Sequence, residues 1–153
     1  MKTAIVYYSY EGNCALVAER IKPVLNADPV RLETVSKNGF IGFISCLLTG
    51  KNPALKPHGF DPSNYDLIVL GTPVWAFSPA PVMQSFLSET RIRGKKIALF
   101  LCHDGGMKKA MDKFKKMLDG NTIVSEIDFN KPAKNDSEKQ EERIKDWANS
   151  LKQ

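Results

Sequence analysis

The sequence lacks the paired cysteines of a disulfide framework or a structural zinc site. Its three cysteines, Cys14, Cys46 and Cys102, are widely spaced, form no CxxC pair and have no histidine at the spacing of a zinc ligand. An odd number of isolated cysteines argues against disulfide bonds and against a structural metal. We therefore expect no metal site, and we interpret Cys46 and Cys102 as small buried hydrophobic residues.

Long hydrophobic runs are also missing. The longest run, Phe40 to Leu48, falls well short of the roughly 20 residues that a membrane-spanning helix needs. The first residues have the pattern of a strand and not of a charged leader with a small-residue cleavage site. The chain contains no internal repeat or low-complexity block, and its 153 residues fit one domain of common size. We expect a single domain over residues 1–153, a cytoplasmic location and no membrane span.

Acidic residues are scarce between Arg91 and Met117. This window holds nine lysines and arginines against Asp104 and Asp112, and the whole chain has a formal net charge of +5. The window is either a solvated helix face or a docking surface for an acidic partner or an anionic substrate, because a patch of one sign steers association. The lysines are not interleaved with aromatic residues and no recognised binding module is visible, so we expect no nucleic-acid partner.

Five segments have the apolar and β-branched character of strands, and five have the spacing of amphipathic helices. The expected strands are Lys2–Tyr8, Pro29–Val35, Asp66–Gly71, Lys96–Leu101 and Thr122–Phe129. The expected helices are about Ala15–Leu25, Phe40–Leu48, Ala80–Glu89, Met107–Leu118 and Asp136–Leu151. Their alternation predicts an α/β fold with a parallel sheet and helices on both faces, because right-handed crossovers force that layering.

Three loops are expected at the carboxyl end of this sheet, where ligands of such folds bind. The first, Ser9–Cys14, offers unpaired backbone N–H groups, the Ser9 hydroxyl and a helix dipole, all of which favour an anion. It contains no lysine or arginine, so dipoles and hydrogen bonds would hold the anion. The second, Thr72–Ala80, carries Trp75 and Phe77, whose flat surfaces can cover an aromatic ring.

The third loop, Cys102–Gly106, ends in two adjacent glycines, whose peptides rotate with little steric penalty. Its His103 has two interpretations: a local hydrogen-bonding residue or a proton donor. Trp75 and Phe77 can likewise be packing residues beneath a long loop. A phosphate seat, an aromatic cover and a flexible glycine loop together suit a phosphorylated, planar heterocycle.

At these loops the sequence resembles the flavodoxin family, and the resemblance covers nearly the whole chain. The matching segments are Ala4–Ile21, Asp66–Leu87 and Lys95–Gly106. The family's phosphate loop reads Ser/Thr-x-Thr-Gly-x-Thr/Ser. Ser9, Gly12 and Asn13 lie in register with this pattern, and Glu11 and Cys14 replace two of its hydroxyl residues.

The resemblance implies a three-layer, doubly wound sandwich with a five-stranded parallel sheet of order 2-1-3-4-5. It also implies non-covalently bound FMN that transfers one or two electrons. The first loop would hold the FMN phosphate, the second would flank the isoalloxazine, and the third would contact the opposite edge of the ring. The implied cofactor-binding residues are Ser9, Tyr10, Glu11, Gly12, Asn13, Cys14, Thr72, Pro73, Val74, Trp75, Ala76, Phe77, Cys102, His103, Asp104, Gly105 and Gly106. No catalytic residue is implied.

The departures from the family pattern bear on affinity and on partners. Losing two hydroxyls removes two phosphate hydrogen bonds, each worth about 0.5 to 1.5 kcal/mol net, and Glu11 must turn outward or repel the phosphate. Electron-carrier flavodoxins are typically acidic, so a basic member is expected to use other partners. The expected role is an electron carrier or an NAD(P)H/quinone-type oxidoreductase, with a redox partner protein or a small-molecule donor or acceptor, as a monomer or homodimer.

Two other functions remain open at this point. Cys14 and Arg20 have the C-x5-R spacing of cysteine-dependent low-molecular-weight phosphatases, although the residues between them, Ala15–Glu19, form a helix and not a phosphate loop. The second open function is that of a non-catalytic flavodoxin-like binding module. The segment Phe40–Leu48 is interpreted as core, with a dimer contact or a wall for an apolar substrate as its alternatives.

Overall fold

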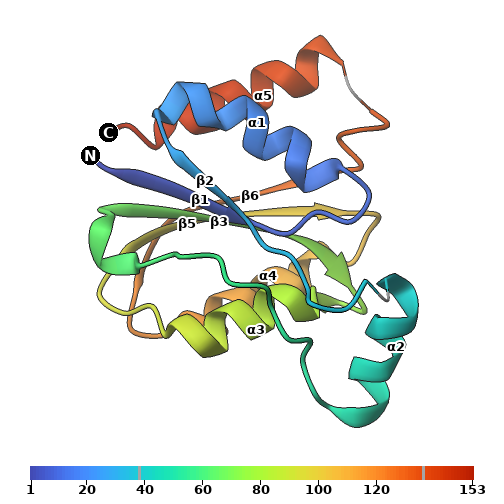
Figure 1. Ribbon diagram of the computed structural model, residues 1–153. Coiled ribbons are helices and arrows are strands. Elements are labelled where there is room, and N and C mark those ends of the chain that lie inside the picture. Colours follow the sequence, from blue (N-terminus) through green and yellow to red (C-terminus); the bar gives the residue numbers. More distant parts are fainter. Residues whose placement is uncertain (38, 136) are drawn as a thin grey trace.

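The structure is a computed structural model that describes residues 1–37, 39–135 and 137–153. Five parallel strands form its central sheet (Figure 1). In spatial order they are β2 (Asp28–Arg31), β1 (Thr3–Tyr7), β3 (Leu67–Trp75), β5 (Lys96–His103) and β6 (Thr122–Asn130). A short strand, β4 (Ser78–Pro79), pairs antiparallel with β3. Apart from β4 the order is the predicted 2-1-3-4-5, which confirms the doubly wound fold.

Helices cover both faces of the sheet, as predicted. Helices α1 (Asn13–Leu25) and α5 (Glu138–Ser150) lie on one face, and α3 (Pro81–Thr90) and α4 (Met107–Met117) lie on the other (Figure 1). Helix α2 (Gly39–Thr49) lies to one side, near the end of β3, and a short 3-10 helix, η1 (Pro62–Asn64), precedes β3. Asp136, where the closing helix was expected to begin, lies outside the described residues.

Two apolar clusters hold these layers together, one on each face of the sheet. Ile5 and Val69 face α1 and α5, whereas Val6 and Leu70 face α3 and α4. This division follows from the alternation of side chains along a strand, and burying such side chains contributes about 1.5 to 3 kcal/mol each. Because the strands are buried on both faces, their apolar runs are continuous, which is why they could be predicted from the sequence.

The segment after Gly71 differs from the prediction. We expected a loop over Thr72–Ala80, but β3 continues to Trp75 and turns back through β4. Ala76 and Phe77, which form this turn, have φ values of 49° and 58°, as a two-residue hairpin with type I′ geometry requires. Neither residue is a glycine, so the sequence carried no hairpin signal. Strand β2 is also shorter than expected and ends at Arg31.

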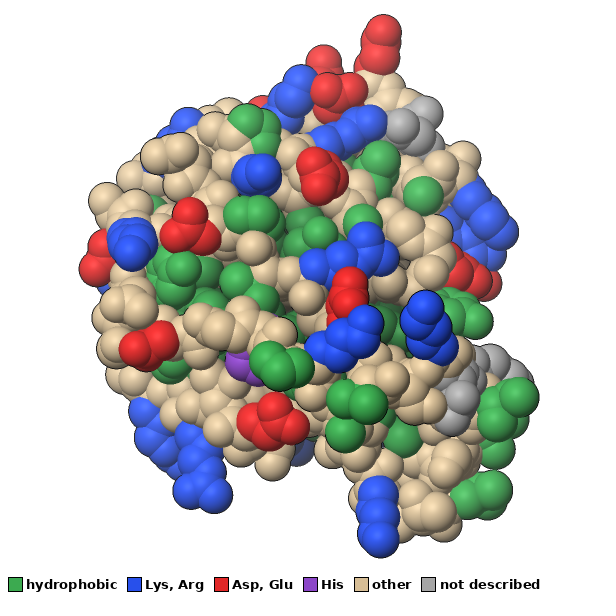
Figure 2. Space-filling view, in the orientation of Figure 1, with side chains coloured by type: hydrophobic (Ala, Val, Ile, Leu, Met, Phe, Trp, Pro, Cys, Tyr) green, Lys and Arg blue, Asp and Glu red, His purple; other side chains and the backbone are tan. Residues whose placement is uncertain are grey.

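Helix α2 is not part of the buried core, contrary to the prediction. Ile41, Leu47 and Leu48 are 76%, 60% and 83% exposed, and Figure 2 shows hydrophobic side chains gathered over α2 at its lower right. The side chain of Phe40 lies outside the described residues. Across the described chain, no helix has the length and apolar character needed to cross a membrane.

Candidate functional site

Residues 8–12 connect the carboxyl end of β1 to the N-terminus of α1. Gly12 is its N-cap with a φ of 90°, a conformation that favours glycine, and it has no side chain that could cap the helix. The Ser9 hydroxyl instead accepts a hydrogen bond from the N–H of Ala15 at 3.1 Å. The N–H groups of Asn13 and Cys14 have no acceptor within the helix. This end of α1 therefore presents backbone N–H donors of the kind that favour an anion.

A turn after β6 brings positive charge to the same position. Lys131 and Lys134 line a cavity together with the Ser9–Cys14 loop. The N–H of Ala133 donates a hydrogen bond to Asn13 Oδ1 at 2.9 Å, and Lys131 Nζ lies 2.7 Å from Asp104 Oδ2. These lysines were not predicted as site residues because they lie far from the loop along the chain. Their place just after the last strand, at the carboxyl edge of the sheet, was the signal that could have found them.

The cavity has a volume of about 300 Å³ and is lined by residues of all three predicted loops and by the two lysines. The lining residues are Ser9, Tyr10, Glu11, Asn13, Cys14, Pro73, Val74, Trp75, Cys102, His103, Asp104, Lys131 and Lys134. A neighbouring cavity of about 310 Å³ shares Tyr10, Glu11, Val74 and Trp75 with it and adds Phe43 and Ala76. The structure thus brings together most of the residues predicted as a site, at one end of the sheet. We call the first of these spaces the α1 cavity.

Trp75 is held in place by aromatic neighbours. Its ring contacts those of Tyr8, Tyr10 and Phe43 edge to face, with centroid distances of 5.9, 5.5 and 5.1 Å. Such contacts add about 0.5 to 1.5 kcal/mol each beyond the burial of area. Trp75 is therefore both a packing residue and a wall of the α1 cavity, so the two interpretations of this residue are not exclusive.

His103 is committed to local hydrogen bonds. Its Nδ1 accepts from the N–H of Gly105 at 2.9 Å, so in the neutral ring Nε2 carries the proton, which it donates to Asp128 Oδ2 at 2.8 Å. The ring is nearly fully buried. This geometry favours the interpretation of His103 as a residue that positions its loop over that of a proton donor.

The remaining predicted residues lie at the rim or beneath the cavity. Phe77 is 58% exposed, and Gly106 packs so closely against its ring that a Cβ at Gly106 would lie 2.7 Å from a Phe77 ring carbon. Gly105 has a φ of 118° and open space beside it. Thr72 is fully buried, and its hydroxyl accepts a hydrogen bond from the N–H of Ala80 at 3.1 Å. Thr72 therefore supports the hairpin and does not face the cavity.

The cysteine at the start of α1 does not have the properties of a phosphatase nucleophile. Burial raises the pKa of the Cys14 thiol well above its ordinary value, and a hydrogen bond with the Cys102 side chain raises it further. A neutral thiol is a poor nucleophile. Arg20 lies within α1 and pairs with Glu141 of α5 at 3.3 Å, so the C-x5-R spacing does not form a phosphate loop. As predicted, Cys102 is buried, but Cys46 is partly exposed.

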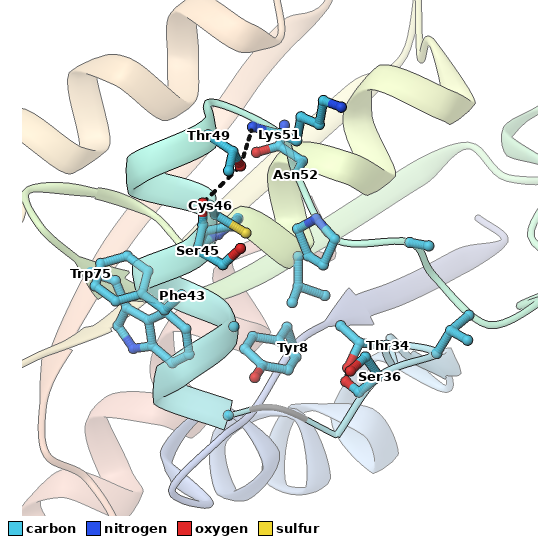
Figure 3. Close-up of a pocket in the computed structure, with 17 residues that line it drawn as sticks. Tyr8, Thr34, Ser36, Phe43, Ser45, Cys46, Thr49, Lys51, Asn52 and Trp75 are labelled. Atoms are coloured by element: carbon cyan, nitrogen blue, oxygen red, sulfur yellow. Dashed lines mark hydrogen bonds between the residues drawn. The ribbon is translucent and has the colours of Figure 1, made fainter.

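A second, larger cavity lies beneath α2. Its volume is about 450 Å³, and Tyr8, Phe43, Cys46 and Trp75 are among the residues that line it (Figure 3). Trp75 lines this space as well as the α1 cavity. We call it the α2 cavity.

Comparison with known proteins shows the family of this chain. A model of a flavodoxin family matches residues 48–151. The chain belongs to the flavodoxin family. The matched range does not include the Ser9–Cys14 loop. No curated protein sequence gives a significant match.

Solved structures show the same flavodoxin fold. A flavoprotein from Lactobacillus acidophilus, solved in complex with FMN, is 23% identical with a TM-score of 0.73, over 88% of this chain and 96% of that one. Two-electron reduced flavodoxin from Megasphaera elsdenii is 19% identical with a TM-score of 0.64, over 97% of this chain and 98% of that one. Oxidised flavodoxin 2 from Bacillus cereus is 22% identical with a TM-score of 0.64, over 97% of this chain and 95% of that one.

Proposed function

We propose that this flavodoxin binds FMN without a covalent bond and transfers electrons through it. The observation that carries the proposal is the meeting of three features in the α1 cavity: the N-terminus of α1, two lysines and the ring of Trp75. An anion position beside a flat aromatic wall matches a ligand with a phosphate at one end and a planar ring at the other. The FMN complex of the similar flavoprotein from Lactobacillus acidophilus supports the same assignment.

The residues of the α1 cavity fit this group. The Ser9 hydroxyl, the first N–H groups of α1 and the ammonium groups of Lys131 and Lys134 form a donor set suited to a phosphate. Glu11, whose charge opposes a phosphate, is exposed, so it can turn toward solvent. Lys131 is already paired with Asp104, whereas Lys134 makes no ion pair with any described residue.

FMN supplies one- and two-electron chemistry when it is bound. The protein determines the position of the flavin ring and its reduction potential. Trp75 would cover one side of the ring and exclude water from it. The turn that carries Lys131 and Lys134 adds positive charge, which favours a reduced, anionic ring if the lysines lie within a Debye length of about 8 to 10 Å. His103 and Asp128 hold the third loop beside this space.

Two finer roles each have an observation in their favour. An electron carrier with an acidic protein partner is supported by the basic rim beside Phe77, where Lys109 Nζ lies 5.7 Å from the ring centroid and Lys113 Nζ lies 2.8 Å from the Ser78 hydroxyl. An NAD(P)H/quinone-type oxidoreductase is supported by the α2 cavity, which has the size of a small-molecule site and shares Trp75 with the α1 cavity.

One experiment separates these roles. The purified protein is loaded with FMN, excess FMN is removed, and oxidation of NADH or NADPH is followed with and without a quinone acceptor. Turnover with a pyridine nucleotide and a quinone supports the oxidoreductase. Reduction of the bound flavin only by a separate reductase protein supports the carrier. Protein that takes up no FMN contradicts the proposed function as a whole.

A further inference from the structure

We propose that the α2 cavity is a binding site for a neutral, planar aromatic molecule that carries oxygen acceptors. The cavity has a volume of about 450 Å³, within the range of small-molecule sites. It lies between α2, the 34–36 segment and the 51–54 segment, and Trp75 forms part of its wall (Figure 3). The inference rests on the residues of this cavity and stands whether or not FMN binds in the α1 cavity.

The shape and character of the walls favour a flat, apolar ligand. Three aromatic side chains, Tyr8, Phe43 and Trp75, line the cavity, with Tyr8 and Phe43 each set edge to face against Trp75. Val35, Pro53, Ala54, Pro81 and Val82 supply further apolar surface. Rigid rings that already contact one another lose little entropy when a second flat ring packs on them.

Hydroxyl groups provide the polar contacts that fix such a ligand. The Tyr8 and Ser45 hydroxyls line the cavity and make no hydrogen bond with any residue in the described part of the chain, so both can donate to a ligand oxygen. Burial raises the pKa of Tyr8, and the nearby Tyr10 raises it further, which keeps its hydroxyl protonated as a donor. In contrast, the Thr49 hydroxyl already donates to the Ser45 carbonyl at 2.7 Å.

The charges around the cavity favour a neutral ligand. Its described lining contains no carboxylate and no guanidinium, and its one charged side chain, Lys51, points away from the space in Figure 3. An ion buried there would lack a partner and pay the cost of desolvation. Because Trp75 lines both cavities, a ligand here would lie one indole away from the FMN proposed above, and this last relationship alone rests on the proposed function.

The test uses 2,3-dimethyl-1,4-naphthoquinone as the probe, because its methyl groups block the ring positions at which the Cys46 thiol would add. Binding is measured by equilibrium dialysis with the full-length protein free of FMN, and again with FMN present. We expect saturable binding of one probe per chain. The hydrocarbon 2,3-dimethylnaphthalene, which has the same outline without the oxygens, is expected to bind about two- to tenfold more weakly for each hydrogen bond it cannot accept.

Variants locate the probe in the cavity. Ser45→Phe fills the space from α2 and is expected to weaken probe binding at least about tenfold, and Tyr8→Phe to weaken it about two- to tenfold through loss of one donor. Leu48→Gln, on the outer face of the same helix, is the matched control and should bind the probe as the wild type does. If Ser45→Phe does not fold by circular dichroism, Cys46→Leu replaces it.

No binding of the probe up to its solubility, or equal binding by wild type and Ser45→Phe, would overturn the inference. FMN titration of the same samples keeps this failure distinct from failure of the proposed function. Ser45→Phe is expected to bind FMN as the wild type does, because Ser45 does not line the α1 cavity.

Discussion

Asn13, the first residue of helix α1, accepts a hydrogen bond at 2.9 Å from the backbone N–H of Ala133, 120 residues away along the chain. The same turn is held at its other end by the N–H of Lys131, which donates to the carbonyl of His103 at 3.1 Å. These two bonds join the first and third predicted loops to a fourth segment. The positive charge at the anion position therefore depends on contacts between residues distant in sequence.

Asn13→Ala tests the hydrogen bond between Asn13 and Ala133. Removing the acceptor releases the turn that carries Lys131 and Lys134, so FMN affinity should fall about two- to tenfold, the range of one neutral hydrogen bond. The free energy of unfolding should fall by no more than about 1 kcal/mol, because the Ala133 N–H is exposed and can bond to water. Affinity is measured by quenching of FMN fluorescence. Asn149→Ala, exposed on α5, is the control, and equal losses in both variants would refute the role of Asn13.

Lys134→Gln removes one positive charge from the α1 cavity without changing the length of the side chain greatly. We expect FMN binding to weaken about two- to fivefold, as for an exposed ion pair worth up to about 1 kcal/mol. Because salt screens such pairs, the difference from wild type should shrink at 1 M salt. Lys139→Gln on α5 changes net charge equally but lies outside the cavity. A matching loss in Lys139→Gln would attribute the effect to net charge and contradict a local role.

Glu11→Gln tests the departure from the family's phosphate loop. Glu11 lines the α1 cavity, so its removal should strengthen FMN binding by up to about fivefold at low salt, through loss of like-charge repulsion. Glu142→Gln, exposed on α5, is the matched control. Unchanged affinity in Glu11→Gln at low salt would show that the carboxylate already points away from the phosphate.

The buried thiol of Cys14 gives a pH prediction. Its pKa is raised in the folded state by burial, so the folded protein keeps a proton that the unfolded chain loses above its ordinary pKa of about 8.5. Stability from this group is complete below that pH and is lost as the pH rises above it. Between pH 8 and 9.5, chemical denaturation should show a steeper fall for wild type than for Cys14→Ala, by at most about 1.4 kcal/mol per pH unit. If the free energy of unfolding falls in parallel with pH for wild type and Cys14→Ala, the raised pKa of Cys14 is contradicted.

The same burial separates the cysteines by reactivity. At pH 8 an alkylating reagent should modify Cys46 first, since Cys14 and Cys102 are buried in the folded protein, and mass spectrometry of peptides reads out the order.

Cys14→Ser should keep FMN binding or strengthen it, because it restores a hydroxyl that the family has at this position.

The strands of the parallel sheet could be predicted from the sequence because of their burial. Strands such as Thr3–Tyr7 are buried on both faces, so their apolar runs are unbroken. The hairpin at Ala76 and Phe77 could not be predicted, because these residues adopt positive φ without the glycine or asparagine that usually signals it. Lys131 and Lys134 could not be predicted because the sequence of the Ser9–Cys14 loop does not reveal which distant turn packs on the N-terminus of its helix.

The measurement that tests the central claim most directly compares FMN with riboflavin, which has the same ring but no phosphate. Both are titrated into the purified protein, and the quenching of flavin fluorescence gives each dissociation constant. With the phosphate held at Ser9–Cys14 and by Lys134, one FMN should bind per chain, and riboflavin should bind at least about tenfold more weakly. Equal affinity for the two flavins would contradict the phosphate position, and no binding of either would contradict the FMN assignment itself.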